Sequence, residues 1–303
     1  MRLLLVVNTR AGTVTPRTVR FIERALSDQA KVRIELTREP GHGVELAGKA
    51  AAGDHDVVAV MGGDGTVNEV ANGLAGSDVP MAIIPGGGTN VLARSLGIPQ
   101  EPIRAAGFLL ARLSGPGRRI PLGRAAERYF TFSCGFGLDA EIVRRVERRQ
   151  RLKRAAGHGY FVWTALRVGL VSYDFKTPRI RARWGSALEH ERDGLTFLIS
   201  QNVDPYSYLG SLPIKVCPRA SLDLGLDAFA GGPVGRIRIV RWALKTLGSG
   251  RHARDRRALS LHDQGRIEVV AASPHPVQMD GEYVGDHDRL LLESVPGALS
   301  ILA

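Results

Sequence analysis

Short apolar runs alternate with amphipathic stretches over the first part of the chain. The runs have the length and composition of buried β-strands, and the stretches between them have the spacing of helices. In chain order the segments are 3–7, 17–26, 32–36, 44–51, 57–61, 67–74, 81–84, 91–95 and 103–113, beginning with a strand and ending with two helices. Such alternation predicts a doubly wound parallel sheet with helices on both faces.

The pattern changes after Ser114-Gly115-Pro116-Gly117, a strong chain-breaking sequence. Beyond it, short β-like runs lie at 129–134, 195–200, 214–217, 267–271, 277–279 and 290–293, with helix-like segments at 140–146, 160–170 and 234–247. We therefore predict an α/β fold with two domains. A parallel-sheet domain spans 1–118 and a mainly antiparallel, β-sandwich-like domain spans 119–292, and we leave open that a strand at 293–303 returns to the first domain.

Charge and cysteine content narrow the classes of partner. The 303 residues carry a net charge of +11, which favours an anionic partner such as nucleic acid, an anionic membrane surface or a phosphorylated ligand. Cys134 and Cys217 form no CxxC pair, which argues against a zinc site and a disulfide scaffold. The apolar run 3–7 is too short for a signal peptide and no run approaches the ~18 residues of a membrane span. We expect a cytoplasmic protein with peripheral membrane contact at most.

Two glycine-rich turns follow apolar runs and precede helix-like segments. The first is Gly62-Gly63-Asp64-Gly65-Thr66-Val67-Asn68-Glu69, and the second is Gly86-Gly87-Gly88-Thr89-Asn90. Glycines with positive φ direct successive backbone N–H groups into one concavity, and a following helix adds its positive dipole end. Two such turns side by side predict a site for the triphosphate of a nucleotide.

Other nucleotide motifs are absent or incomplete. No GxxxxGK[ST] sequence and no protein-kinase signature occurs. Gly135-Phe136-Gly137-Leu138-Asp139-Ala140 fits the dinucleotide pattern, but the acidic residue expected ~20 positions later is missing. We therefore interpret this segment as a structural turn.

Taken together, four motifs resemble one family. The two glycine turns, the segment 135–140 and Asp280-Gly281-Glu282 occur in the order found in the diacylglycerol kinase catalytic-domain family, which includes bacterial soluble lipid kinases and the sphingosine and ceramide kinases. The resemblance spans nearly the entire chain and implies a first domain like those of NAD kinases and lipid kinases. NAD kinases share the Gly-Gly-Asp-Gly-Thr sequence, whereas the late Asp-Gly-Glu favours the lipid-kinase branch.

The resemblance implies a nucleotide site in the first domain. Its residues would be Asn8, Thr9, Arg10, Ala11, Gly12, Thr37, Gly62, Gly63, Asp64, Gly65, Thr66, Val67, Asn68, Glu69, Gly88, Thr89 and Asn90. For Thr66 and Thr89, simple helix N-capping is the alternative interpretation.

Three acidic residues are candidates for the chemistry. A carboxylate beside phosphates repels them, so Asp64 would bind a Mg²⁺-linked water or the acceptor hydroxyl, or else form a local turn. Glu282 matches the proton acceptor of the family, next to Asp280; the alternative is an ordinary Asp-Gly hairpin turn. The family also implies a structural Mg²⁺ in the second domain, here at Asp223 and the backbone of Leu226. Leu224 stands where a second aspartate is usual, so that metal is either displaced or lost.

The sequence therefore predicts an ATP- and Mg²⁺-dependent kinase of a lipid hydroxyl, with diacylglycerol converted to phosphatidic acid. The open alternatives are a kinase of another alcohol (a sphingoid base, a glycolipid or NAD) and a non-catalytic nucleotide-binding regulator at the membrane surface. The basic run 144–154, followed by the aromatic segment 160–166, is interpreted either as an arm for the anionic inner membrane face or as a solvated helix and a core helix; a second basic cluster lies at 251–257. We expect no nucleic acid partner, and a homodimer is left open.

Overall fold

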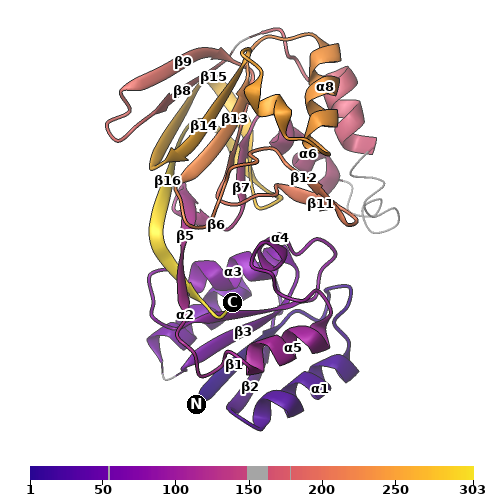
Figure 1. Cartoon of the computed structure of the whole chain (residues 1–303), viewed down its shortest axis with the longest axis vertical. Helices are drawn as coiled ribbons and strands as arrows, with labels where there is room; N and C mark the ends of the chain where they lie inside the picture. Colours follow the sequence, from indigo (N-terminus) through magenta and orange to yellow (C-terminus); the bar gives the residue numbers. More distant parts are fainter. Residues whose placement is uncertain (54, 149–162, 178) are drawn as a thin grey trace. The chain divides into compact units, whose positions relative to one another are not determined.

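The computed structural model describes residues 1–53, 55–148, 163–177 and 179–303 (Figure 1). Contacts divide the chain into two compact units, unit 1 with Met1–Leu122 and Pro296–Ala303, and unit 2 with Gly123–Val295. The chain passes between the units twice, within β5 (Arg118–Ala125) and within β16 (Glu282–Ile301).

Unit 1 contains a parallel sheet with strand order β4-β3-β1-β2. The strands are β1 (Arg2–Val7), β2 (Lys31–Leu36), β3 (Val57–Gly62) and β4 (Met81–Pro85). All residues of β3 and β4 are buried, as their unbroken apolar runs require. Beyond β4, the end of β16 adds a further parallel pairing through Ile301 and Met81.

Helices connect these strands. They are α1 (Pro16–Ser27), α2 (His42–Ala52), α3 (Asp64–Leu74), α4 (Val91–Ser95) and α5 (Pro102–Leu110). Helix α1 begins where the Thr15 side chain accepts the backbone N–H of Thr18, with Pro16 in the first turn. Helix α1 packs on α5, and α2 packs on α3.

Unit 2 is built mainly from antiparallel strands in the order β14-β13-β10-β7-β15-β16. The strands not yet defined are β6 (Arg128–Phe130), β7 (Ser133–Phe136), β8 (Ile180–Trp184), β9 (His190–Leu195), β10 (Phe197–Gln201), β11 (Ser207–Leu209), β12 (Leu212–Ile214), β13 (Leu226–Gly231), β14 (Ala258–Gln264) and β15 (Arg266–Met279). The helical segments are α6 (Leu138–Glu147), η1 (Val168–Ser172), α8 (Arg236–Thr246) and η2 (Arg251–Arg254). Residues 163–167 are also helical and run into η1.

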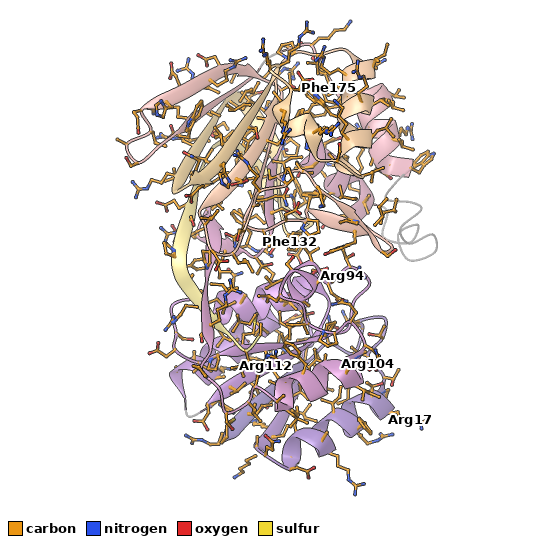
Figure 2. The ribbon with its side chains drawn as sticks, viewed as in Figure 1. Arg17, Arg94, Arg104, Arg112, Phe132 and Phe175 are labelled. Carbon is orange, nitrogen blue, oxygen red and sulfur yellow. The ribbon has the colours of Figure 1, made fainter. Side chains whose placement is uncertain are left out.

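The central strands of unit 2, β7, β10 and β13, are buried on both faces, and their side chains alternate between the two sides of the sheet. Leu198 and Ala230 contribute to one hydrophobic cluster, whereas Phe197 and Phe229 contribute to another. Trp242 of α8 completes the second cluster, which also contains Phe175, labelled in Figure 2.

Some predicted elements of the second half were wrong in detail. The runs 267–271 and 277–279 belong to one strand, β15, whose register shifts between Val270 and His275. The run 129–134 splits into β6 and β7 because the N–H groups of Thr131 and Phe132 bond to a side chain instead of a neighbouring strand. β12 ends at Ile214, so 214–217 is not a strand. Part of the predicted helix 160–170 lies outside the described residues.

Candidate active site

The two glycine loops leave the sheet of unit 1 at the same edge. Gly62 at the end of β3 pairs with Pro85 at the end of β4, and the carboxyl ends of parallel strands are where α/β sheets bind ligands. The N–H of Gly86 donates to the carbonyl of Gly62 at 2.7 Å. The two loops are therefore in direct backbone contact.

The glycines are needed for this close packing. A Cβ on Gly87 would lie 2.7 Å from the Cα of Gly63, and one on Gly86 would lie 3.1 Å from the Cα of Gly62. None of these four glycines has a positive φ. Our prediction of a left-handed backbone at the glycines of these loops is therefore wrong. In the second loop the left-handed residue is Asn90, with φ 50°.

Asp64 joins the first loop to the second. Its carboxylate accepts the N–H of Asn90 at 2.9 Å and the N–H of Val91 at 2.6 Å. These donors lie at the N-terminus of α4, where a carboxylate is stabilised by N–H groups and by the helix dipole. Backbone donors of the second loop thus stabilise and position the Asp64 carboxylate. A contact of Asp64 with metal or acceptor remains a prediction.

Glu69 makes the equivalent connection to α2. Its two carboxylate oxygens accept the N–H groups of Gly41 and Gly43 at 2.8 and 2.9 Å. Gly41 precedes the first turn of α2 and has no side chain to satisfy those N–H groups. Asp64 and Glu69, both in the first two turns of α3, therefore each bind the N-terminus of a neighbouring helix, α4 and α2 respectively.

The loop after β1 completes this edge of unit 1. Asn8 donates through Nδ2 to Thr66 Oγ1 at 2.8 Å, and its Oδ1 accepts the N–H of Arg10 at 3.0 Å. The N–H of Thr13 donates to the carbonyl of Gly86 at 3.1 Å. Three loops far apart in sequence are thus bonded to one another.

The predicted nucleotide-binding residues fall into an accessible group and a buried group. Those at least partly accessible are Asn8, Thr9, Arg10, Ala11, Gly12, Thr37, Gly63, Asp64, Gly65, Glu69, Gly88 and Thr89. The buried ones are Gly62, Thr66, Val67, Asn68 and Asn90. N-capping does not explain Thr66 or Thr89, because the N-cap residues of α3 and α4 are Gly63 and Asn90.

In unit 2, Asp280 and Gly281 form the turn between β15 and β16. Both have positive φ, 50° and 80°, which gives the mirror-image turn favoured in two-residue hairpins. The Asp280 carboxylate is buried and accepts the N–H groups of Thr131, Phe132 and Ser133 and the Thr131 hydroxyl, at 2.6 to 3.0 Å. Burial raises the pKa of Asp280, and these hydrogen bonds oppose the rise. Such contacts favour a positioning role over the catalytic role predicted for it.

Glu282 directly follows the turn and pairs with Met279 in the hairpin. One carboxylate oxygen bonds the Arg128 guanidinium at 2.6 Å, and 43% of the side chain remains exposed. Of the two acids in this turn, Glu282 is therefore the accessible one.

Asp139 is an acid to which sequence reasoning gave no role, although it lies within one of the four motifs. It is buried in the first turn of α6 and accepts from Gln278 Nε2 at 3.0 Å and the Tyr206 hydroxyl at 3.4 Å. Gln278 also accepts the N–H of Gly281 at 2.8 Å through Oε1, which connects Asp139 to the hairpin turn. Burial raises the pKa of Asp139 to about 6.

The metal site predicted in unit 2 is not tested. Among residues 1–53, 55–148, 163–177 and 179–303 there is no group of three or more His, Cys, Asp or Glu residues that could hold a metal ion. The predicted site needs only the Asp223 carboxylate and the Leu226 carbonyl, so it stays a prediction.

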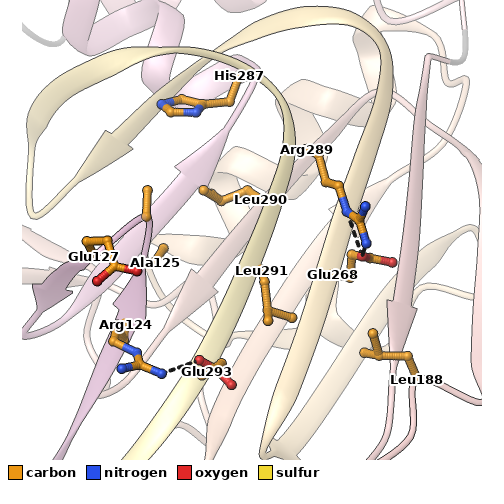
Figure 3. Close-up of a pocket in the computed structure, with 11 residues that line it drawn as sticks. Arg124, Ala125, Glu127, Leu188, Glu268, His287, Arg289, Leu290, Leu291 and Glu293 are labelled. Atoms are coloured by element: carbon orange, nitrogen blue, oxygen red, sulfur yellow. Dashed lines mark hydrogen bonds and ion pairs between the residues drawn. The ribbon is translucent and has the colours of Figure 1, made fainter.

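A hollow of about 530 Å³ lies elsewhere in unit 2 (Figure 3). Arg124 bonds Glu293 at 2.6 Å and Arg289 bonds Glu268 at 2.6 Å across its wall. The Arg124 hydrogen bond lowers the pKa of Glu293. None of the predicted site residues lines this hollow.

The fold and the paired glycine loops define a class of α/β protein with two glycine loops in contact at the carboxyl edge of a parallel sheet. Residues 2–123 match the diacylglycerol kinase catalytic domain family. A diacylglycerol kinase of Bacillus subtilis is 29% identical over 251 residues, 81% of this chain and 77% of the relative. A "probable lipid kinase YegS-like" of Pseudomonas aeruginosa PAO1 is 27% identical over 306 residues, 99% of this chain and 93% of the relative.

A crystal structure of a diacylglycerol kinase from Bacillus anthracis aligns over 99% of this chain and 96% of that chain, with a TM-score of 0.78 and 23% sequence identity. The predicted α/β fold, with its parallel first sheet and mainly antiparallel second part, is confirmed. Residues 2–123 thus match the diacylglycerol kinase catalytic domain family, and the chain as a whole is similar to lipid kinases of the diacylglycerol kinase and YegS-like group. The match to this kinase family implies the use of ATP.

Proposed function

We propose that the protein transfers the γ-phosphoryl group of ATP to the hydroxyl of diacylglycerol, which gives phosphatidic acid and ADP. The acceptor oxygen forms a bond to the γ-phosphorus, the bond from that phosphorus to the bridging oxygen breaks, and the hydroxyl proton passes to a carboxylate. The observation that carries the proposal is the backbone contact between the two glycine loops of unit 1, which leaves Gly63, Gly88 and Thr89 accessible.

ATP is assigned to unit 1. Phosphoryl transfer relies mainly on positioning and charge neutralisation, and backbone N–H groups in glycine loops supply both without a bulky side chain. Arg10, in the loop after β1, is exposed and adds positive charge. Mg²⁺ neutralises phosphate charge when it is bound. We assign Asp64 as the acid that faces this Mg²⁺. Its carboxylate is already held in place by backbone N–H donors.

The acceptor lipid is assigned to unit 2, with Glu282 as the proton acceptor. Asp280 holds the turn through four hydrogen bonds, and Gln278 holds Gly281. The Arg128 ion pair fixes one oxygen of Glu282. These contacts support a fixed carboxylate at the turn, as general base catalysis requires.

A γ-labelled ATP assay tests the proposal with diacylglycerol, sphingosine, phosphatidylglycerol, a glycolipid and NAD as acceptors. We expect labelled phosphatidic acid, and a loss of roughly 10²-fold or more in kcat for Glu282→Gln because the proton acceptor is removed. Asp286→Asn, an acid on the same strand, is the control and should retain activity. Label in another product would assign another alcohol, and no acceptor-dependent use of ATP would favour the regulator.

Membrane contact is the remaining part of the proposal. In the part of the chain that the structure describes, no helix has both the length and the apolarity to cross a bilayer. The predicted arm 144–154 is described only up to residue 148, and both Arg144 and Arg145 pair with Glu141. The two arginines share the single carboxylate of Glu141, and Arg144 also pairs with Asp286 at 3.4 Å, so these ion pairs compete with anionic lipid for both side chains.

A further inference from the structure

Helix α8 has an inner face that explains how it is held. Ile239 and Trp242 are 9% and 3% exposed and pack into the hydrophobic cluster around Phe229. The Trp242 ring lies edge-on to Phe229, with centroids 5.4 Å apart, and its Nε1–H donates to Asp255 at 2.9 Å. The inner face is fully used by unit 2.

The outer face of α8 carries a second apolar stripe. Ile237, Val240 and Leu244 are 80%, 36% and 64% exposed. Their spacing of three and four residues places them on one side of the helix. A helix that only covers a core has no use for apolar residues on its opposite side, so this stripe indicates a contact with something outside the chain.

A neighbouring segment extends the apolar surface. In Figure 1 the helical ribbon of residues 163–172 lies beside α8, and the Arg236 guanidinium donates to the carbonyl of Val171 at 3.1 Å. Val171 is 66% exposed and Leu170 is 37% exposed. We call these five exposed side chains the α8–η1 surface: Leu170, Val171, Ile237, Val240 and Leu244.

The charges around this surface indicate which kind of partner it binds. Helix α8 contains four basic residues and no acidic one, and residues 163–172 contain Arg167 and no acidic one. Arg238 is neutralised by Asp255 at 2.8 Å, whereas Arg236 and Arg241 are exposed. Basic residues that border an exposed apolar stripe match a bilayer interface with anionic headgroups. A second copy of this chain would place like charges against each other, which disfavours self-association.

We propose that the α8–η1 surface docks the protein on anionic membranes, with the apolar stripe at the headgroup–acyl boundary and Arg236, Arg241 and Lys245 on the lipid phosphates. This inference deepens the proposed function, on which it rests, by naming the surface that meets the lipid. It places a membrane contact on a helix at the surface of unit 2, in addition to the arm predicted at 144–154, of which residues 149–154 lie outside the described residues.

Vesicle co-sedimentation without ATP tests the docking. Wild-type protein should bind vesicles of phosphatidylcholine with about 30% phosphatidylglycerol and should bind pure phosphatidylcholine much more weakly, because headgroup charge contributes to affinity. Ile237→Ser/Leu244→Ser and, separately, Arg241→Gln/Lys245→Gln should each lower the affinity at least tenfold. The matched controls Phe21→Ser and Ile103→Ser alter apolar residues of unit 1 that are 53% and 45% exposed, and should bind like wild type.

Two readouts keep docking separate from catalysis and from folding. Thermal unfolding should show the variants folded, and with short-chain diacylglycerol in detergent micelles Ile237→Ser/Leu244→Ser should phosphorylate at the wild-type rate. Unchanged vesicle binding of both double variants overturns the inference, as does a wild-type dimer that Ile237→Ser/Leu244→Ser converts to monomers without loss of vesicle binding. Vesicle binding that needs this surface, in a protein that phosphorylates no lipid, would support the docking and reject the proposed function.

Discussion

Acidic residues in the glycine motif and in the late hairpin mainly organise the backbone. Asp64, Glu69 and Asp280 each accept two or more backbone N–H groups. Charge-assisted hydrogen bonds of this kind are stronger than neutral ones. The sequence could show that acids stand beside glycine loops, but it could not show these donors, because they lie up to 149 residues away. Glu282 is the exception, since its side chain remains accessible.

The buried acid Asp139 predicts a specific pH dependence. Its pKa of about 6 in the folded protein lies above the ordinary value of 3.8, so the folded state binds the proton more tightly than the unfolded state. Its contribution to stability is therefore fully present below about pH 4 and is lost as the pH rises to about 6. At ~1.4 kcal/mol per pKa unit, the loss is about 3 kcal/mol.

Asp139→Asn removes this titration. We expect the free energy of unfolding of the variant, measured with urea from pH 4 to 7, to lack the fall of about 3 kcal/mol that wild type shows from this group. Subtracting one curve from the other removes the contributions of the other titrating residues to the free energy of unfolding. Parallel curves for the two proteins would show that Asp139 titrates normally.

At the scale of elements, the hydrophobic pattern predicted unit 1 well and unit 2 less well. The strands of unit 1 are unbroken apolar runs between helices, so local pattern and final structure agree. In β15 the sequence Ser273-Pro274-His275-Pro276 suggested a break between two strands. The strand nevertheless continues through a register shift, because β16 pairs with it both before and after that shift. The split between β6 and β7 depends on Asp280, which no local pattern can reveal.

The contact between the glycine loops gives a second prediction. Gly87→Ala places a methyl group 2.7 Å from the Cα of Gly63, which must push the loops apart. We expect a loss of about 1–3 kcal/mol in stability, as overpacking typically causes, together with at least tenfold weaker ATP binding by titration calorimetry.

Gly107→Ala in α5 is the control, because its added methyl group meets no atom within 4 Å. That change should raise the stability by up to about 1 kcal/mol through helix propensity and leave ATP binding unchanged. Equal ATP affinities for Gly87→Ala and wild type would contradict the role assigned to the loop contact.

At the scale of the whole chain, residues 296–303 belong to unit 1, although all of unit 2 lies between them and the rest of unit 1 in the sequence. Leu299, Ile301 and Leu302 are at most 3% exposed, and the N–H of Leu302 donates to the carbonyl of Met81 at 2.9 Å. Burial of each such side chain contributes about 1.5–3 kcal/mol. Together they approach the net stability of a typical domain.

We therefore predict that a chain ending at Val295 has an unfolded or aggregating unit 1. Ile301→Ala is the graded form of this test and should lower the free energy of unfolding by about 2–5 kcal/mol. Leu291→Ala, at a position of the same strand that is 39% exposed, should lower it by less than about 1 kcal/mol. A truncated chain that unfolds cooperatively and binds ATP like wild type would refute the prediction.

The return of residues 296–303 to unit 1 sets the order of events during synthesis on the ribosome. Residues 1–122 emerge first, but the last strand segment that completes their sheet emerges only after all of unit 2 has been translated. At 5–20 residues per second this interval is roughly 10–35 s. During that time the edge of β4 lacks its partner and is open to pairing with other chains. In the cell, the half of the chain that is made first is therefore the half that matures last and has the longest need of protection by a chaperone.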